Sequence, residues 1–113
     1  VKRGLSARQT ERLAKGFALE LAEFGIRVNT VEPGFAPGST VSPLSDTYVK
    51  KMISGIPLQR SSGPGDTPEA ILFLCSPQAS FITGATLSVD GGNSVGTFEP
   101  GGLKIDDLRL PGR

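Results

Sequence analysis

Few residue types in this chain are able to carry out chemistry, and they are poorly placed to do so. The sequence holds one tyrosine, Tyr48, one cysteine, Cys75, and no histidine. A thiol becomes nucleophilic when a base or a positive charge lowers its pKa, and no imidazole is present to do this. We therefore expect Cys75 to be a buried structural thiol. Tyr48 would need a lysine beside it to act as an acid or base, and we expect Lys51 to point elsewhere.

Metal binding is equally poorly supported by the composition. Without histidine and with a single cysteine, carboxylates are the main ligands left. The adjacent residues Asp106 and Asp107 stand near the end of the sequence, where we interpret them as two solvated charges. We therefore expect no metal site.

The run from Gly25 to Gly34 is the stretch most typical of a ligand-facing element. Its β-branched residues over 26–31 predict a strand, and Pro33 is expected to end it because proline has no N–H for the ladder. Ligands of open α/β sheets bind at the carboxyl ends of the strands, so we expect the turn at Pro33 and Gly34 to face a cofactor. On spacing alone, a simple turn is the alternative.

The elements that must hold this turn are predicted from caps and apolar periodicity. Ser6 and Gln9 form the pattern of a capping box, and Gly25 supplies the left-handed residue that commonly ends a helix. Residues 70–75 are apolar on every side, so we expect their helix to be buried on more than one face, either in the core or against a partner subunit. In chain order we expect a helix over 6–24, a strand over 26–31, a short helix over 47–54, a helix over 67–76 and a strand over 85–89.

This order of elements indicates an α/β fold. A strand, a helix and a second strand predict a right-handed crossover that places the two strands parallel. A sheet of two strands leaves one edge open, and unpaired N–H and C=O groups at an edge favour pairing with another chain. We therefore expect self-association, or association with a missing N-terminal half.

Length, charge and hydropathy limit the function. The 113 residues fit one domain, and 12 basic residues against 11 acidic ones leave a net charge of +1. This balance lacks the basic stripe of a nucleic-acid binder, so we expect no nucleic-acid partner. No apolar run reaches the roughly 18 residues of a membrane span, and no signal peptide is recognised, so we expect no membrane contact and a cytoplasmic location.

A series of motifs follows along the chain from about Ser6 to Gly92. They are Ala18-Leu19-Glu20-Leu21-Ala22, Gly25-Ile26-Arg27-Val28-Asn29, Pro33-Gly34, Ile56-Pro57-Leu58-Gln59-Arg60, Glu69-Ala70-Ile71-Leu72-Phe73-Leu74, Phe81-Ile82-Thr83-Gly84 and Val89-Asp90-Gly91-Gly92. In this order and spacing the chain resembles the C-terminal half of a short-chain dehydrogenase/reductase, in particular the bacterial 3-oxoacyl-reductase-like members of that family.

The resemblance implies a fold and an activity. Residues 1–92 would form the C-terminal part of a Rossmann-type, doubly wound parallel sheet, followed by a flexible tail over 93–113. The parent family transfers hydride between NAD or NADP and a small-molecule carbonyl substrate. The backbone of the turn, at Pro33, Gly34, Phe35 and Ala36, would then approach the carboxamide of the cofactor.

The same resemblance argues against catalysis by this chain. The family's catalytic pair is a tyrosine and a lysine four residues later, and counting back from Glu20 places these positions on Arg3 and Ala7. Ser6 matches the serine that commonly precedes the lysine, which supports the register. Arginine stays protonated and alanine carries no charge, so neither can act as the acid or base. The family's glycine-rich phosphate loop would lie before Val1, and we expect no catalytic residue here.

Two functions stay open from the sequence. The chain is either the C-terminal portion of an NAD(P)-dependent oxidoreductase, inactive by itself, or a non-catalytic relic that pairs with other subunits. The resemblance implies that such pairing would use the helix over 67–76 and the strand over 85–89.

Overall fold

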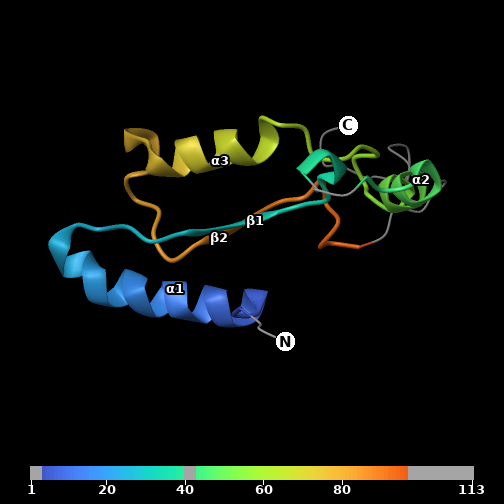
Figure 1. Ribbon diagram of the computed structural model, residues 1–113. Helices are drawn as coiled ribbons and strands as arrows, with labels where there is room; N and C mark the ends of the chain where they lie inside the picture. The colour runs from blue at the N-terminus through green and yellow to red at the C-terminus, as the bar shows by residue number, and fades with distance from the viewer. Residues whose placement is uncertain (1–3, 40–42, 97–113) are drawn as a thin grey trace, which may run out of the picture.

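Two short parallel strands form the centre of the protein, whose computed structural model describes residues 4–39 and 43–96 (Figure 1). Strand β1 spans Thr30–Pro33 and strand β2 spans Thr86–Val89. They pair in parallel, with Thr30 opposite Thr86 and Pro33 opposite Val89. The α/β class and the parallel arrangement predicted from the order of elements are confirmed.

The first helix, α1 (Ala7–Leu21), begins and ends as its sequence predicts. The Ser6 hydroxyl accepts from the backbone N–H of Gln9 at 3.1 Å, and the Gln9 side chain accepts from the Ser6 N–H at 2.8 Å. A 3₁₀ turn over Ala22–Phe24 follows, and Gly25 then takes a left-handed φ of 71°. Together these segments cover the helical range expected over 6–24.

Two further helices complete the fold. Helix α2 spans Asp46–Ser54, where Ser45 caps the first turn by accepting from the Tyr48 N–H. Helix α3 spans Asp66–Cys75 and runs into a 3₁₀ turn over Pro77–Ala79. Both helices lie within one residue of the ranges expected from the sequence at each end.

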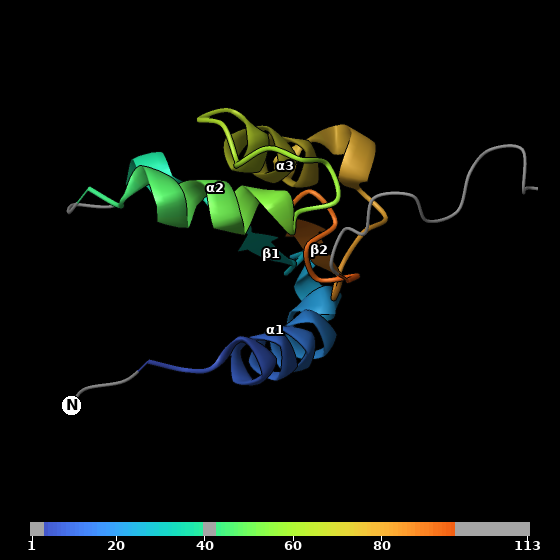
Figure 2. The same ribbon diagram turned by 90° about the vertical axis from the view of Figure 1, so that its right-hand side faces the viewer.

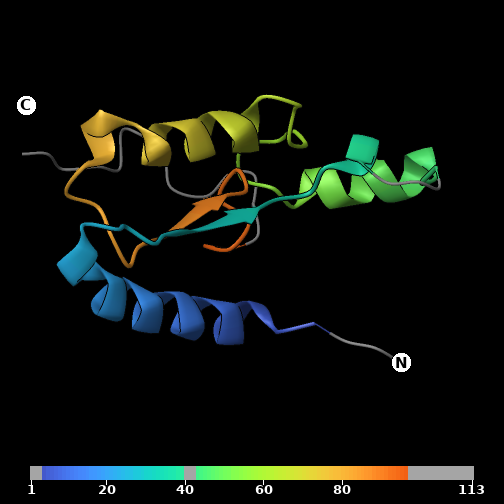
Figure 3. The ribbon, with the colours of Figure 1, turned by 60° about the vertical axis from the view of Figure 1, so that its left-hand side comes forward.

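The elements form three layers, with α1 on one face of the sheet and α3 on the other (Figures 1 and 3). The view turned by 90° keeps the same order, with α1 below the strands and α3 above them (Figure 2). Helix α2 lies beyond the carboxyl ends of the strands (Figure 3). In the described part of the chain the buried apolar side chains are Ala18, Ile56, Leu74 and Ala79, which is a very small core.

The first strand begins later than predicted and includes Pro33, so the expected range of 26–31 is wrong at both ends. Residues before Thr30 are held by a backbone hydrogen bond from the Gly84 N–H to the Val28 carbonyl at 2.7 Å and by side chains. The Asn29 amide donates to the Ile82 carbonyl at 3.0 Å, and its oxygen accepts from the Ala85 N–H at 3.0 Å. Pro33 is tolerated because it is the last residue of a strand at the edge of the described sheet.

Burial of α3 against a partner subunit stays a prediction, because within the described residues the helix is covered on one face, whereas the burial predicted for Cys75 is wrong. The helix buries Leu74, whereas Leu72 is 62% exposed and Phe73 is 48% exposed. Cys75 is exposed as well and is not the buried thiol that its lack of an activating base suggested. One face of α3 packs on the sheet, and the described residues supply no second layer to cover the other face.

Some predictions fall outside the described residues. These are the assignment of the family's tyrosine position to Arg3, the carboxylates Asp106 and Asp107, and most of the tail expected over 93–113. Residues 93–96 are described, and Asn93 and Val95 donate backbone hydrogen bonds back to the carbonyls of Asp90 and Gly92. Within the described ranges, no helix is both long and apolar enough to cross a membrane.

Candidate functional site

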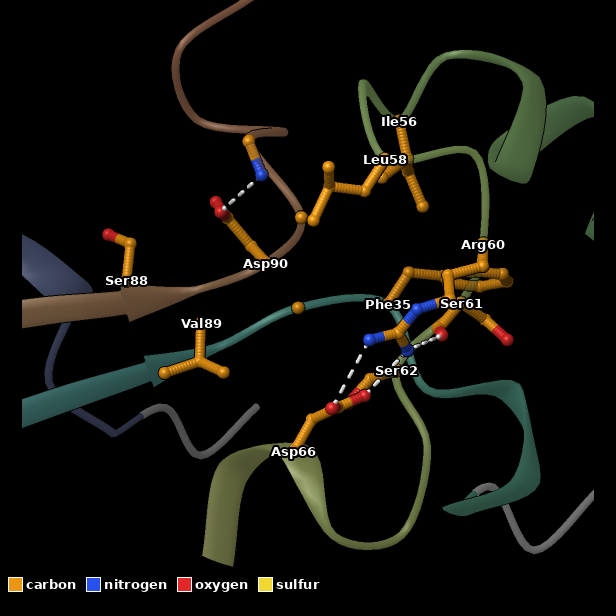
Figure 4. A pocket seen from close by; sticks show the side chains of 13 residues that line it. Phe35, Ile56, Leu58, Arg60, Ser61, Ser62, Asp66, Ser88, Val89 and Asp90 are labelled. Carbon is orange, nitrogen blue, oxygen red and sulfur yellow. Dashed lines mark hydrogen bonds and ion pairs between the residues drawn. The ribbon is translucent and has the colours of Figure 1, made fainter. Parts of the chain in front are cut away.

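A cavity of about 300 Å³ opens at the carboxyl ends of the two strands (Figure 4). Its lining comes from residues 34–35, from the segment 56–62, from Asp66 and from residues 88–92. Of the four residues predicted to bind a cofactor, Gly34 and Phe35 line this cavity, whereas Pro33 and Ala36 do not. Three of the motifs, those at 33–34, 56–60 and 89–92, are therefore brought together at one edge of the sheet.

Gly34 is required by the close approach of the two strand ends. A Cβ atom at this position would lie 2.6 Å from the Asp90 Cα and 3.2 Å from the Val89 carbonyl oxygen. Real Cβ atoms do not come this close to backbone, so any side chain at Gly34 would push the strand ends apart. Gly34 therefore has a packing role, whether or not the turn also contacts a ligand.

The turn after β2 is fixed by the carboxylate of Asp90. This carboxylate accepts from the Gly92 N–H at 3.1 Å and from the Ser94 N–H at 2.9 Å. Hydrogen bonds from Ser94, and further ones from the backbone of Gly92, lower the pKa of Asp90. Gly91 takes a left-handed φ of 65°, and a Cβ there would meet the Ile56 side chain at 2.9 Å.

The loop between Arg60 and Asp66 is closed by an ion pair. Arg60 Nη1 lies 2.7 Å from one Asp66 oxygen, and Nη2 lies 3.3 Å from the other (Figure 4). The same carboxylate accepts from the Gly63 N–H at 2.7 Å. The hydrogen bonds from Arg60 and then from Gly63 lower the pKa of Asp66 to about 2.

Two contacts hold the predicted cofactor-facing turn through Phe35, and a third joins the segment before Arg60 to the turn after β2. The Ser62 N–H donates to the Phe35 carbonyl at 2.8 Å, and the Leu58 N–H donates to the Gly91 carbonyl at 3.0 Å. The Phe35 ring also meets the ring of Tyr48 edge-on, with centroids 6.3 Å apart. Tyr48 thus supports the turn from α2 by packing.

The backbone conformation of Gln59 is a feature of this region that was not predicted from the sequence. Its φ is +58°, a left-handed conformation that is strained for a residue with a side chain. The side-chain amide donates to the carbonyls of Ser54 and Ile56 at 3.0 and 2.8 Å, which satisfies the end of α2. This hydrogen bonding compensates the strain and turns the chain from α2 toward the cavity.

The described residues do not complete a site for a nicotinamide dinucleotide. The pyrophosphate of such a cofactor is bound by a glycine-rich turn at a helix N-terminus, or by cations. In residues 4–39 and 43–96, Arg60 is the one cation that lines the cavity, and its guanidinium already contacts Asp66. The apolar lining, which includes Phe35 and Leu58, fits a ring or an aliphatic group better than a phosphate.

Metal binding is not supported either. The described residues contain no group of three or more histidine, cysteine, aspartate or glutamate side chains that could hold an ion. The acidic residues of the cavity, Asp66 and Asp90, are each engaged by hydrogen-bond donors of their own loops.

The ion pair between Arg60 and Asp66 was not predicted from the sequence. Arg60 ends one of the motifs, and Asp66 stands where α3 begins. A loop with Gly63, Pro64 and Gly65 between opposite charges indicates a chain reversal. The pairing itself depends on the path of the loop, which spacing alone does not give.

Comparison with known proteins extends these observations. Residues 4–94 match the family model described as enoyl-(acyl carrier protein) reductase. A 3alpha-hydroxysteroid dehydrogenase of Mediterraneibacter gnavus is 46% identical over 79 residues, which are 70% of this chain and 32% of that protein. A tropinone reductase homologue of Arabidopsis thaliana is 42% identical over 89 residues, covering 77% of this chain and 34% of the relative.

A 3-oxoacyl-[acyl-carrier-protein] reductase of Vibrio harveyi is 41% identical over 78 residues, which are 69% of this chain and 32% of that reductase. The chain therefore spans about a third of the length of the relatives it matches. Since the family model covers residues 4–94, which are most of the sequence, the protein belongs to the short-chain dehydrogenase/reductase family.

Proposed function

We propose that this chain is the C-terminal portion of an NAD(P)-dependent oxidoreductase that transfers hydride between the cofactor and a small-molecule carbonyl or alcohol. The observation that carries the proposal is the closed turn at the carboxyl ends of β1 and β2, where Gly34 and Phe35 line a cavity. This is the edge at which open α/β sheets bind their ligands. The family membership supports the reaction class.

In this proposal the turn meets the nicotinamide end of the cofactor. Pro33, Gly34, Phe35 and Ala36 would present backbone to the carboxamide, and Gly34 allows the strand ends to approach closely enough for the turn to form. When bound, the cofactor would supply the hydride. The protein's own contribution here is to hold the turn in one conformation.

We further propose that the chain is inactive by itself. The position that corresponds to the family's lysine holds Ala7, which cannot lower the pKa of a neighbouring tyrosine or hold a ribose. The described residues also lack a phosphate-binding turn. Residues 1–92 would thus be one part of a dinucleotide-binding domain, followed by a tail over 93–113, and we propose the cytoplasm as its location.

A chimera tests whether the turn is competent. Residues 10–94 would replace the matching segment of the Vibrio harveyi reductase, so that the host keeps its own start of the helix. We expect activity with NADPH or NADH within about tenfold of the host, a loss of about 1.4 kcal/mol at most. A folded chimera without turnover would refute the proposed role of the turn.

The matched pair of variants for the chimera is Gly34→Val and Gly38→Val. Gly34→Val should reduce turnover about 100-fold, because a displacement of about 1 Å at a binding turn has effects of this size. Gly38 has open space around its Cβ position, so its variant should keep the activity of the chimera. The purified chain alone, freed of host enzymes, should show no cofactor-dependent turnover.

A second candidate function is a non-catalytic interaction module, and one surface favours it. The groove between α3 and β1 is lined by Arg27, Val28, Asn29, Val31, Ile71, Leu74 and Cys75. Beside it the outer face of α3 exposes Leu72 and Phe73, and within the described residues β1 pairs with β2 alone. Exposed apolar surface of this kind, next to an open strand edge, is typical of an interface.

We therefore propose that this surface mediates self-association, or pairing with a segment that corresponds to the N-terminal part of the longer relatives. Light scattering of the purified chain at micromolar concentration tests the proposal. We expect a mass above that of one chain, with the share of larger species rising with concentration. A monodisperse monomer with cooperative thermal unfolding would count against both forms of it.

A further inference from the structure

The turn at Gly34 and Phe35 is held from outside by a loop that would be difficult to order alone. The contact is the hydrogen bond from the Ser62 N–H to the Phe35 carbonyl, 2.8 Å long. Ser62 is followed by Gly63, Pro64 and Gly65. Glycine loses more backbone freedom on ordering than any other residue, so this loop needs a strong restraint to keep Ser62 in place.

That restraint is built from three interactions on one carboxylate. Asp66 accepts from both terminal nitrogens of Arg60, at 2.7 and 3.3 Å, and from the Gly63 N–H at 2.7 Å. Arg60 Nη1 additionally donates to the Ser61 carbonyl at 3.1 Å. Hydrogen bonds between charged groups in this two-pronged geometry are the strong ones. They close the loop on both sides of Ser62.

We propose that Arg60 and Asp66 are positioning residues that fix the turn at Gly34 and Phe35 through Ser62. That this turn faces a cofactor rests on the function proposed above. The hydrogen-bonded connection from the ion pair through Ser62 to the turn does not. Both residues also line the cavity, but the proposed action of the pair is on the backbone of the turn. Its effect is therefore expected in the order of the loop and the turn.

The exposure of the pair separates this role from a general stabilising one. The side chains of Arg60 and Asp66 are 59% and 34% exposed. Exposed ion pairs contribute little to the free energy of unfolding. Loss of the pair should thus loosen residues 61–63 and the Phe35 contact, while α1 and the strand pairing stay as they are.

Amide hydrogen exchange of the full chain, measured by NMR without any cofactor, is the test. In Asp66→Asn and in Arg60→Gln, the Ser62 amide should exchange about fivefold faster or more, as expected for loss of one hydrogen bond's protection. The matched control is Glu69→Gln, which removes the same charge from the first turn of the same helix. Its Ser62 amide should exchange as in the unaltered chain.

Two outcomes would overturn the proposal. One is an unchanged Ser62 amide in both Asp66→Asn and Arg60→Gln. The other is an equal acceleration of the amides of α1, which would make the pair a global stabiliser. Because no cofactor is present, failure here is distinct from failure of the chimera.

Discussion

The cavity at the strand ends and the groove between α3 and β1 differ in how much of their surroundings this chain supplies. The cavity is closed by hydrogen bonds that link the turn after β1, the loop over 60–66 and the turn after β2. Beside the groove lies an apolar face of α3, on which Leu72 and Phe73 are exposed. The contrast teaches that the backbone at the strand ends is held by contacts within this chain, whereas the flank leaves apolar side chains exposed.

The size of the core agrees with this contrast. Few apolar side chains are buried in the described residues, so hydrophobic burial is small. The hydrogen-bonded strand ends hold their geometry in a chain that has little other stabilisation.

The largest effect is expected for Gly34→Val in the unaltered chain. Its Cβ would meet the Asp90 Cα, and overpacking of this kind destabilises by about 3 kcal/mol. With so small a core, we expect the cooperative urea transition followed by circular dichroism to disappear. Gly38→Val is the control and should shift the free energy of unfolding by less than about 0.5 kcal/mol. Similar transitions in both variants would mean that the strand ends are not closely packed.

Replacing Asn29 tests the other end of the same strands. Asn29→Ala removes the donor to the Ile82 carbonyl and the acceptor of the Ala85 N–H, both in a part-buried setting. We expect a loss of about 2 kcal/mol in the free energy of unfolding, because the part-buried Ala85 N–H loses its partner, whereas the Ile82 carbonyl keeps the Arg27 guanidinium as a donor. The exposed Asn93→Ala is the control. Equal, small losses in the two variants would show that the Asn29 bridge is not needed.

A charge on the exposed face of α3 should separate association from folding. Leu72→Lys is expected to change the free energy of unfolding by less than about 0.5 kcal/mol while lowering the mass measured by light scattering. Val95→Lys, in the turn after β2, places the same charge near the strand ends and should leave the mass unchanged. If Val95→Lys has the larger effect, the strand-end region and not the flank is the interface.

The smallest effect is expected in acid. Because Arg60 and Gly63 lower the pKa of Asp66 from 3.8 to about 2, this group stabilises the folded loop above pH 3.8. That contribution is lost as the pH falls from 3.8 through 2, where the carboxylate becomes protonated. The Gly63 amide shift should follow a transition near pH 2, and Asp66→Asn should abolish it. A midpoint near the ordinary value of 3.8 would contradict the pairing.

The sequence predicted the parts of the fold that depend on neighbours along the chain. The capping box at Ser6, the left-handed Gly25 and the helix boundaries all follow from local hydrogen bonding. The parallel pairing follows from the order of elements. The start of β1 was wrong because Asn29 takes its partners from residues more than 50 positions away, which no local pattern contains.

The site was predicted only in part, because its other features also depend on contacts that local sequence patterns do not contain. The motifs pointed to Gly34 and Phe35, and both line the cavity. The ion pair of Arg60 with Asp66 and the left-handed Gln59 depend on the path of a loop, so composition does not reveal them. Burial of Cys75 was wrong because an apolar helix indicates only that cover is needed. It does not say which chain provides it.

The tight contact at Gly34 has an evolutionary consequence. A family comparison would normally treat a glycine at the carboxyl end of a strand as the mark of a ligand that needs room. Here the space is taken by the backbone of Asp90 from the same chain. Selection for folding alone would retain this glycine, even in a gene copy that had lost its ligand. Its presence in a sequence is therefore a poor criterion for separating working oxidoreductases from folded copies without activity.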